Sequence, residues 1–496
     1  MTERTTDGKE GVSGETDSRL RFLLAAALLF GVGARVVLAL GRPLWADEIF
    51  TLTLARKALP DLLAALRVDS GPPLHYVAAR LLLLPFAGPG PADVVVRLLS
   101  VGASLLHVPL FVRIGRRCGA PRAGFVAAAL FLVFPLAVSS GAEGRGYALA
   151  SLLALAAYER LLALEEAPRA RTAALAGILG AAAVLTHYLA LLPVAGMLVA
   201  SLAGGKSRRL ALLASGLAAA LAASWLPVAL LQPRASMAWA EVQPLGERAL
   251  QFVANLGLGL PVEPEPAQLL GPVVLVLLGA ALVERRARAR IPATAPLLAG
   301  LFLLGPLLLF NRSVLLPDRT ALLFLPFVAL VLSEARSLVP AAAGPAAAAV
   351  LAASMPGWLR PTPAARLADT LVPPVRSGAR VVAAELWGPE LDYRLSREGL
   401  PGRVTPYPSV VALHPGWYSE SEVPGEKLGA QAGAVVGGVS ERTFFVLSSS
   451  TRAGRALLAR LGLAGGARVA QAGVFEVWLL EPGPGEGRPT ARDGPS

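Results

Sequence analysis

The sequence predicts an all-α polytopic membrane protein with about eleven transmembrane helices, surface helices in the first outer loop and a small extracytoplasmic α/β domain at the C-terminus. Composition predicts the membrane class, because the chain is 54% hydrophobic and only 16% charged, whereas a soluble domain carries about 25% charged residues. Apolar runs of roughly 18 or more residues also recur, and each is long enough to cross a hydrocarbon core about 30 Å thick.

The arginines predict the orientation of these spans. The formal net charge is +12, and most arginines fall in short loops between apolar runs, which the positive-inside rule places in the cytoplasm. The excess of positive charge therefore indicates topology rather than nucleic-acid binding. Arg19 and Arg21 precede the first span, about Phe22 to Leu40, so we expect the N-terminus in the cytoplasm. Arg35, inside that span, either snorkels toward the membrane surface or faces a catalytic cavity.

A long outer loop, about Gly41 to Asp93, follows the first span and contains two short helical patterns. The first, about Ile49 to Arg67, is amphipathic. The second begins at Pro72 and runs to about Phe86, which is short for a span. If it crossed the membrane, the next cluster of arginines would lie outside. The positive-inside rule therefore favours helices that lie on the membrane surface.

Changes in composition divide the chain into four predicted segments. Residues 1–18 form a disordered cytoplasmic tail, residues 19–355 the multi-pass membrane domain, residues 356–482 the extracytoplasmic α/β domain, and residues 483–496 a disordered tail rich in proline and glycine. Within the third segment the residue pattern predicts three strands and one helix, at Arg380–Leu386, Thr443–Ser448, Val474–Leu480 and Arg452–Leu461.

Two adjacent carboxylates, Asp47 and Glu48, follow directly on the first apolar run in the segment W-A-D-E. Ionisable groups at a membrane are rare without a function. We interpret one of the two as a general base that accepts a proton from an acceptor hydroxyl. Acids also favour the first turn of a helix through capping and the helix dipole, so a solvated helix start is the alternative interpretation.

Two further clusters are predicted on the same side of the membrane. The stretch D-S-G-P-P-L-H-Y places Asp69, His75 and Tyr76 at a Pro-initiated surface helix, where they also suit an acceptor or headgroup site. The stretch A-E-G-R-G-Y follows a later span and contains three candidates for donor binding, Glu143, Arg145 and Tyr147. An arginine beside a membrane binds phosphate through two hydrogen bonds, and the glutamate either orients it or contacts the sugar. An ordinary ion pair within the loop is the alternative.

His187 and two late arginines complete the set of candidates for donor or phosphate binding. His187 falls at a predicted outer membrane boundary, where a structural histidine is as good an interpretation as a functional one. Arg312 and Arg319 flank a short polar segment on the same side of the membrane. Two cations near the outer leaflet suit a lipid phosphate, and interface anchoring also explains them. No spacing of histidines, cysteines and acids predicts a metal site.

The order of these motifs resembles a known family. W-A-D-E, D-S-G-P-P-L-H-Y, A-E-G-R-G-Y-A-L, L-T-H-Y and the late N-R-S-V-L-L-P-D-R-T-A-L-L-F-L-P are similar to motifs of the polyprenyl-phosphate-dependent glycosyltransferases of the C superfamily. This family includes protein O-mannosyltransferases and the lipid A aminoarabinose transferase. The C-terminal domain is variable in the family and carries no matching motif.

The resemblance implies an enzyme of the cell inner membrane that moves a sugar, with inversion, from a polyprenyl-phosphate lipid to a hydroxyl or amine of a glycan, lipid or protein acceptor. It implies a role in cell-envelope glycan, lipopolysaccharide or protein glycosylation. Asp47 matches the catalytic carboxylate of the family and Glu48 its neighbour; Glu143, Arg145 and Tyr147 match a motif near the donor, and His187 matches a position at the end of the fifth span. Some relatives use a divalent metal, which this sequence leaves open. A transporter or flippase for a lipid-linked glycan is the alternative function.

Overall fold

The computed structural model describes residues 7–69, 71–86, 89–204, 207–232, 243–259, 290–310, 315–334, 338–385, 387–412 and 423–482, with a few single residues between 260 and 289. Contacts divide the chain into two compact units. The membrane unit comprises Met1–Arg42, Ala55–Pro85 and Val94–Leu359, and the C-terminal unit comprises Pro43–Leu54, Phe86–Asp93 and Arg360–Ser496. Two short pieces of the first outer loop thus group with the C-terminal residues.

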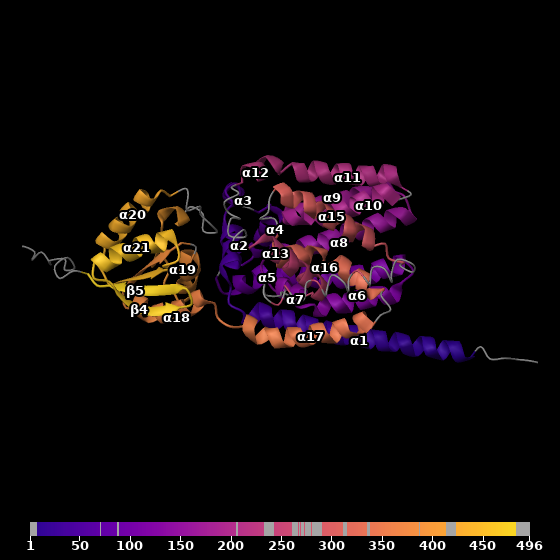
Figure 1. Cartoon of the computed structure of the whole chain (residues 1–496), viewed down its shortest axis with the longest axis horizontal. Helices are drawn as coiled ribbons and strands as arrows, with labels where there is room; N and C mark the ends of the chain where they lie inside the picture. Colours follow the sequence, from indigo (N-terminus) through magenta and orange to yellow (C-terminus); the bar gives the residue numbers. More distant parts are fainter. Residues whose placement is uncertain are drawn as a thin grey trace, which may run out of the picture. The chain divides into compact units, whose positions relative to one another are not determined.

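The membrane unit is built almost entirely from helices (Figure 1). In chain order its helices are α1 (Asp7–Gly41), α3 (Leu59–Leu66), α4 (Leu74–Leu83), α5 (Pro89–Arg117), α6 (Pro121–Val133), α7 (Pro135–Gly141), α8 (Tyr147–Glu166), α9 (Ala170–Thr186), η1 (Tyr188–Ala190), α10 (Leu191–Gly204), α11 (Arg208–Ala223), α12 (Leu226–Leu231), α13 (Leu245–Leu258), α15 (Thr294–Phe310), α16 (Pro317–Ser333) and α17 (Leu338–Trp358). The first turn of α5 is the exception, because it belongs to the C-terminal unit. A large apolar core joins α5, α6, α8, α9, α10 and α16.

Hydropathy and length support the predicted membrane class. Within the described part of the chain, three helices are long and apolar enough to cross a membrane, and a fourth crossing results if α6 and α7 form one bent span. The number of spans stays a prediction, since the region expected to hold the eighth span lies largely outside the described residues. In the first outer loop, α2 (Ala46–Arg56), α3 and α4 are each too short to cross; their place on the membrane surface stays a prediction.

The N-terminal helix differs from the prediction. Helix α1 begins at Asp7, so it includes most of the segment that we predicted to be disordered. Residues 8–21 contain no proline, and the helix continues through them despite the glycines at positions 8, 11 and 14. The tail predicted at 483–496 lies outside the described residues.

A proline breaks the third apolar run into two helices. Helices α6 and α7 are bent by 66° at Phe134, where the backbone is extended and Pro135 opens α7. Proline lacks an N–H group and disfavours the helical conformation of the residue before it. The break therefore leaves backbone carbonyls that the helix itself no longer satisfies, and in an apolar surrounding each such group is costly.

Arg35 of α1 supplies a donor for one of these carbonyls and contacts both helices. Its guanidinium donates to the carbonyl oxygens of Leu132 at 2.9 Å and Ala137 at 3.3 Å, and to the Ser104 hydroxyl at 2.8 Å. The Arg35 side chain has 0% exposure. It therefore does not snorkel, and its contacts show it holding the broken helix pair.

We predict that Arg35→Met lowers the free energy of unfolding by about 2–4 kcal/mol, because each buried carbonyl left without a donor costs about 1–3 kcal/mol. Thermal unfolding of the detergent-solubilised protein measures the effect. Arg171→Ala, at an exposed position near the start of α9, is the control and should leave the melting temperature unchanged. Equal melting temperatures for Arg35→Met and wild type would contradict the assignment.

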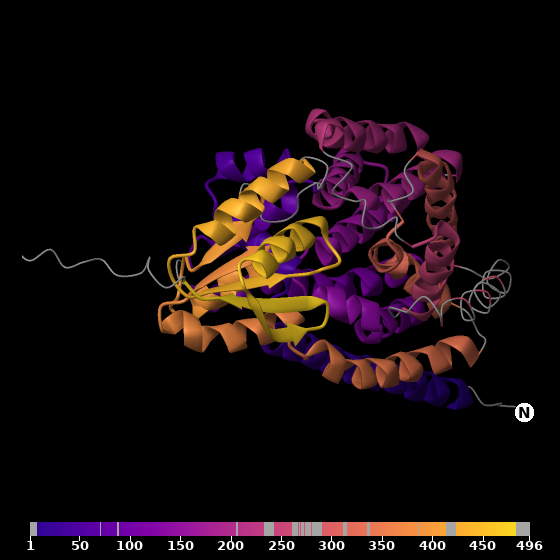
Figure 2. The same cartoon turned by 60° about the vertical axis from the view of Figure 1, so that its left-hand side comes forward.

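The C-terminal unit contains a five-stranded sheet of strand order β2-β1-β3-β5-β4. Strands β2, β1 and β3 are parallel, whereas β5 is antiparallel to both β3 and β4. One core lies between the sheet and helices α18 and α19, and a second lies between the sheet and α20 and α21 (Figure 2). The elements are α18 (Pro363–Arg376), β1 (Arg380–Ala384), α19 (Trp387–Arg397), β2 (Val404–Tyr407), η4 (Ser409–Ala412), α20 (Gly425–Gly437), β3 (Thr443–Leu447), α21 (Arg452–Leu463), β4 (Ala467–Ala472) and β5 (Phe475–Leu480).

The predicted α/β character of this unit is confirmed. The three predicted strands correspond to β1, β3 and β5, and the predicted helix to α21. Strands β2 and β4 were missed because both lie at sheet edges, where a buried face does not enforce a hydrophobic pattern. Strand β2 contains Pro406, which is tolerated at an edge, and most of β4 is exposed.

Candidate active site

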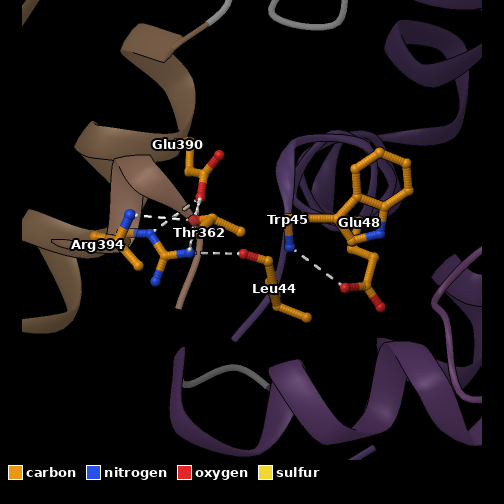
Figure 3. A network of polar contacts seen from close by, with 7 residues as sticks. Leu44, Trp45, Glu48, Thr362, Glu390 and Arg394 are labelled. Atoms are coloured by element: carbon orange, nitrogen blue, oxygen red, sulfur yellow. Dashed lines mark hydrogen bonds and ion pairs between the residues drawn. The ribbon is translucent and has the colours of Figure 1, made fainter. Parts of the chain in front are cut away.

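The predicted carboxylate pair lies in the first turn of α2. Trp45 immediately precedes the helix, and a carboxylate oxygen of Glu48 accepts a hydrogen bond from the Trp45 backbone N–H at 3.3 Å (Figure 3). This is the contact that the third helical residue makes in a capping box. Glu48 has 0% exposure, whereas Asp47 is partly exposed. Glu48 thus holds the start of the helix, and Asp47 is the carboxylate of the pair with access to the surroundings.

In the membrane unit, Asp69 and Tyr76 converge above Gly71. A Cβ atom placed on Gly71 would lie 3.2 Å from a carboxylate oxygen of Asp69 and 3.3 Å from the Tyr76 hydroxyl. Both side chains are nearly buried, with exposures of 7% and 5%. A side chain at this position would press against both polar groups, and a glycine avoids that close contact.

A glutamine that the sequence analysis missed holds the loop that carries Asp69. The Gln232 amide nitrogen donates to the carbonyl oxygens of Leu66 at 2.7 Å and Gly71 at 3.0 Å, on the two sides of this loop. The Gln232 amide oxygen accepts from the Tyr188 hydroxyl at 2.9 Å, which in turn accepts from the indole N–H of Trp225 at 2.9 Å. A single glutamine after an apolar helix matches no motif, so the sequence offered no signal for it.

Two arginines lie around one aromatic ring. The guanidinium carbon of Arg145 is 6.0 Å from the centroid of the Tyr147 ring, and that of Arg319 is 5.6 Å from the same centroid. Arg145 also donates to the Tyr76 hydroxyl at 3.5 Å. The structure thus brings together Tyr76, Arg145, Tyr147 and Arg319, which come from three distant parts of the sequence. Two guanidinium groups at one place attract an anion strongly and offer planar, bidentate geometry to it.

His75 and His187, the two histidines of the motifs, lie beside these arginines. His75 is neutral near pH 7, and His187 packs against the Tyr147 ring. Burial first, and the positive charge of Arg145 second, lower the pKa of His75 from 6.5 to about 4. The His75 Nε2 group donates to the Gly144 carbonyl at 3.3 Å, and its Nδ1 atom has no hydrogen-bond partner among the described residues. The ring of His187 lies 4.9 Å from the Tyr147 ring, and its Nδ1 accepts from the backbone N–H of Leu189 at 3.3 Å.

Glu143 forms an ion pair within the membrane unit. Its carboxylate contacts Arg42, at the end of the first span, at 3.1 Å. Arg97, which is almost fully buried, donates to the carbonyl oxygens of Ala39 and Arg42 at 2.8 and 2.6 Å. These contacts join the end of α1 to the loop of Arg145. Glu143 therefore pairs with a residue at the end of α1 and not within its own loop, as the alternative interpretation had it.

Arg312, predicted to bind phosphate together with Arg319, lies outside the described residues. Among those that are described, no group of three or more histidines, cysteines and acids is placed to hold a metal ion. Cys118 is the single cysteine of the chain.

The fold and the site define a class of protein. It is a polytopic membrane protein in which positively charged and buried polar side chains lie close together near helix ends. Comparison with solved structures identifies the fold of this chain. The chain is similar to ArnT from Cupriavidus metallidurans bound to undecaprenyl phosphate, with a TM-score of 0.50 at 14% identity over 93% of this chain and 98% of ArnT. The chain has the fold of the polyprenyl-phosphate-dependent glycosyltransferases of the C superfamily, the family that its motifs resemble.

Two further solved structures are similar at lower scores. The archaeal oligosaccharyltransferase AglB from Archaeoglobus fulgidus, in complex with an inhibitory peptide and a dolichol-phosphate, gives a TM-score of 0.46 at 13% identity over 92% of this chain and 74% of AglB. The arabinofuranosyltransferase AftD from Mycobacteria gives 0.44 at 17% identity over 95% of this chain and 42% of AftD. No protein-family model and no curated protein sequence matches the chain.

We predict that the stability of this protein falls with acid partly through His75. The unfolded chain binds a proton at His75 below about pH 6.5, whereas the folded protein does so only below about pH 4. The unfolded state therefore binds more protons in this window, and the free energy of unfolding decreases as the pH falls from 6.5 to 4. In His75→Gln, whose amide can still donate to Gly144, melting temperatures measured across this window should fall less steeply. Identical slopes for variant and wild type would contradict the neutral histidine.

Proposed function

We propose that the protein is a membrane glycosyltransferase that moves a sugar from a polyprenyl-phosphate donor to a hydroxyl or amine of an acceptor, with inversion. The observation that carries the proposal is the pair of guanidinium groups, Arg145 and Arg319, beside the Tyr147 ring. The reaction takes place on the extracytoplasmic face of the cell inner membrane, in cell-envelope glycan, lipopolysaccharide or protein glycosylation. Residues 19–355 form the catalytic membrane domain and residues 356–482 an extracytoplasmic domain.

The arginine pair binds the donor phosphate. When the glycosidic C–O bond breaks, negative charge develops on the phosphate oxygen of the leaving polyprenyl phosphate. Cations already in place stabilise this charge without further reorganisation. Tyr147 holds both guanidinium groups by cation–π interaction. The solved ArnT structure contains undecaprenyl phosphate, a lipid of the class proposed here.

Asp47 is the general base. It accepts the proton of the acceptor hydroxyl or amine as the acceptor oxygen or nitrogen attacks the anomeric carbon from the side opposite the leaving phosphate. Its partial exposure suits this role, whereas Glu48 is buried and bonded to the Trp45 N–H. Glu48 therefore positions the base and does not act as one.

Asp69, His75 and Tyr76 recognise the headgroup or the acceptor. Asp69 and Tyr76 present two polar groups above Gly71, and neutral His75 offers an acceptor nitrogen at Nδ1. Neutral and acidic groups of this kind suit hydroxyl and amino groups of a sugar. Glu143 fixes the adjoining loop through Arg42, and His187 packs against Tyr147.

We predict that Asp47→Asn lowers the rate of sugar transfer at least a hundredfold, whereas Glu48→Gln retains the rate within about tenfold. A glutamine at 48 keeps an oxygen that accepts from Trp45, and an asparagine at 47 cannot take up a proton. The assay is transfer from radiolabelled polyprenyl-phosphate sugars in membranes with matched expression. Equal transfer by wild type and Asp47→Asn would remove Asp47 from the mechanism. Absence of transfer by the wild type from every donor tested would favour a flippase, for which translocation of the lipid-linked sugar is then measured.

We predict that Arg145→Gln and Arg319→Gln each raise the apparent KM for the lipid donor at least tenfold, because each removes one charged contact to phosphate. Arg209→Gln, exposed on α11, is the matched control. Direct binding of polyprenyl phosphate, followed by native mass spectrometry, separates donor binding from chemistry. Unchanged binding in both variants would place the phosphate elsewhere.

A further inference from the structure

One peptide group at the entry to α2 is held from both sides. The Leu44 carbonyl oxygen accepts a hydrogen bond from the Arg394 guanidinium at 2.9 Å, and the Trp45 N–H donates to Glu48 at 3.3 Å (Figure 3). These two atoms belong to the same planar peptide group. Two charged side chains, one from α19 and one from α2, therefore fix the orientation of the peptide group that precedes α2.

Arg394 is itself held in place. Its guanidinium donates to one carboxylate oxygen of Glu390 from two nitrogen atoms, at 2.7 and 3.2 Å. Glu390 has 1% exposure and also accepts from the Thr362 hydroxyl at 2.8 Å. Thr362 in turn caps the start of α18 by accepting from the Ala365 N–H at 3.1 Å. A buried, charge-assisted network of this kind leaves the guanidinium little freedom.

A single face of α19 contacts both ends of the first outer loop. Glu390, Tyr393, Arg394 and Arg397 follow the spacing of residues that share one side of a helix. Arg394 holds Leu44 near the start of the loop. Tyr393 and Arg397 both contact the carboxylate of Asp93, at its end. These segments belong to the same compact unit.

We propose that α19 is a positioning element for Asp47, so that the C-terminal domain takes part in catalysis by orienting the base. Asp47 lies in the first turn of α2, three residues after Leu44. A rotation of the Leu44–Trp45 peptide would change the direction of that turn and displace the carboxylate. This inference rests on the proposed function, because it gives the domain a role in placing the base of that reaction.

Loss of the Arg394 contact is expected to affect kcat and the apparent KM for the lipid donor differently. The arginines proposed to bind the donor phosphate belong to the membrane unit, and the contacts of α19 lie in the other unit. Loss of the Arg394 contact should therefore leave the apparent KM for the lipid donor within about twofold and lower kcat. A misplacement of about 1 Å at a reacting group is enough for a hundredfold loss, so we expect kcat to fall by a factor of about 10–100.

The test uses the full chain with the double variant Glu390→Gln, Arg394→Met. This variant removes the bond to Leu44 without leaving an unpaired buried charge, which would itself destabilise the domain. Arg394→Lys, which keeps the charge but lacks the planar fork of the guanidinium, should be intermediate. Arg366→Met, exposed on α18, is the matched control. Steady-state transfer gives kcat and KM, and hydrogen exchange measures protection of the backbone amides of Trp45 to Phe50.

The expected result is a fall in kcat at nearly constant donor KM, together with at least tenfold faster exchange at Trp45 to Phe50 in the double variant alone. The double variant in the Asp47→Asn background should show no further loss of rate, because the network acts through Asp47. Unchanged kcat, or unchanged exchange at these amides, would overturn the inference. If the wild type transfers no sugar, the proposed function fails, whereas the exchange measurement still decides whether α19 holds this segment.

Discussion

Arginine side chains that donate to backbone carbonyls at the ends and breaks of helices are the interaction on which this structure depends. In an apolar surrounding a helix end leaves carbonyl groups that must find donors. Arg35 supplies them at the break after α6, Arg97 at the end of α1, and Arg394 at the entry to α2. Arginine suits the task because its planar group donates in several directions at once. Each such contact also brings together segments that are distant in sequence.

The same interaction gives the candidate site its rigidity. The helix break after α6 precedes the loop of Arg145, and the end of α1 pairs with Glu143 in that loop. On the other side, Gln232 holds the loop of Asp69 through neutral hydrogen bonds. Asp69 and Arg145, two of the side chains proposed to contact substrate, thus stand on loops that polar contacts hold in place, as precise placement of reacting groups requires.

Hydropathy and charge predicted the membrane class, because burial in lipid imposes long apolar runs that a sequence displays directly. Helix α21 and strands β1, β3 and β5 were equally visible, since each has a buried face. The roles of Gln232 and Arg394 were not predictable. Each acts through a partner more than a hundred residues away, and a single polar residue carries no periodic pattern. The capping role of Glu48 was not predictable either. It depends on which of two adjacent acids turns its side chain back toward Trp45, and the sequence does not show this.

The isoelectric point of about 10.6 therefore has a second origin besides membrane orientation. Arg35, Arg97 and Arg248 are buried and donate to neutral carbonyl oxygens. The chain contains only four lysines among its 46 basic residues, and an ammonium group cannot reproduce the fork of a guanidinium. Part of the basicity of this protein therefore comes from buried arginines that donate to backbone carbonyls where helices end or break.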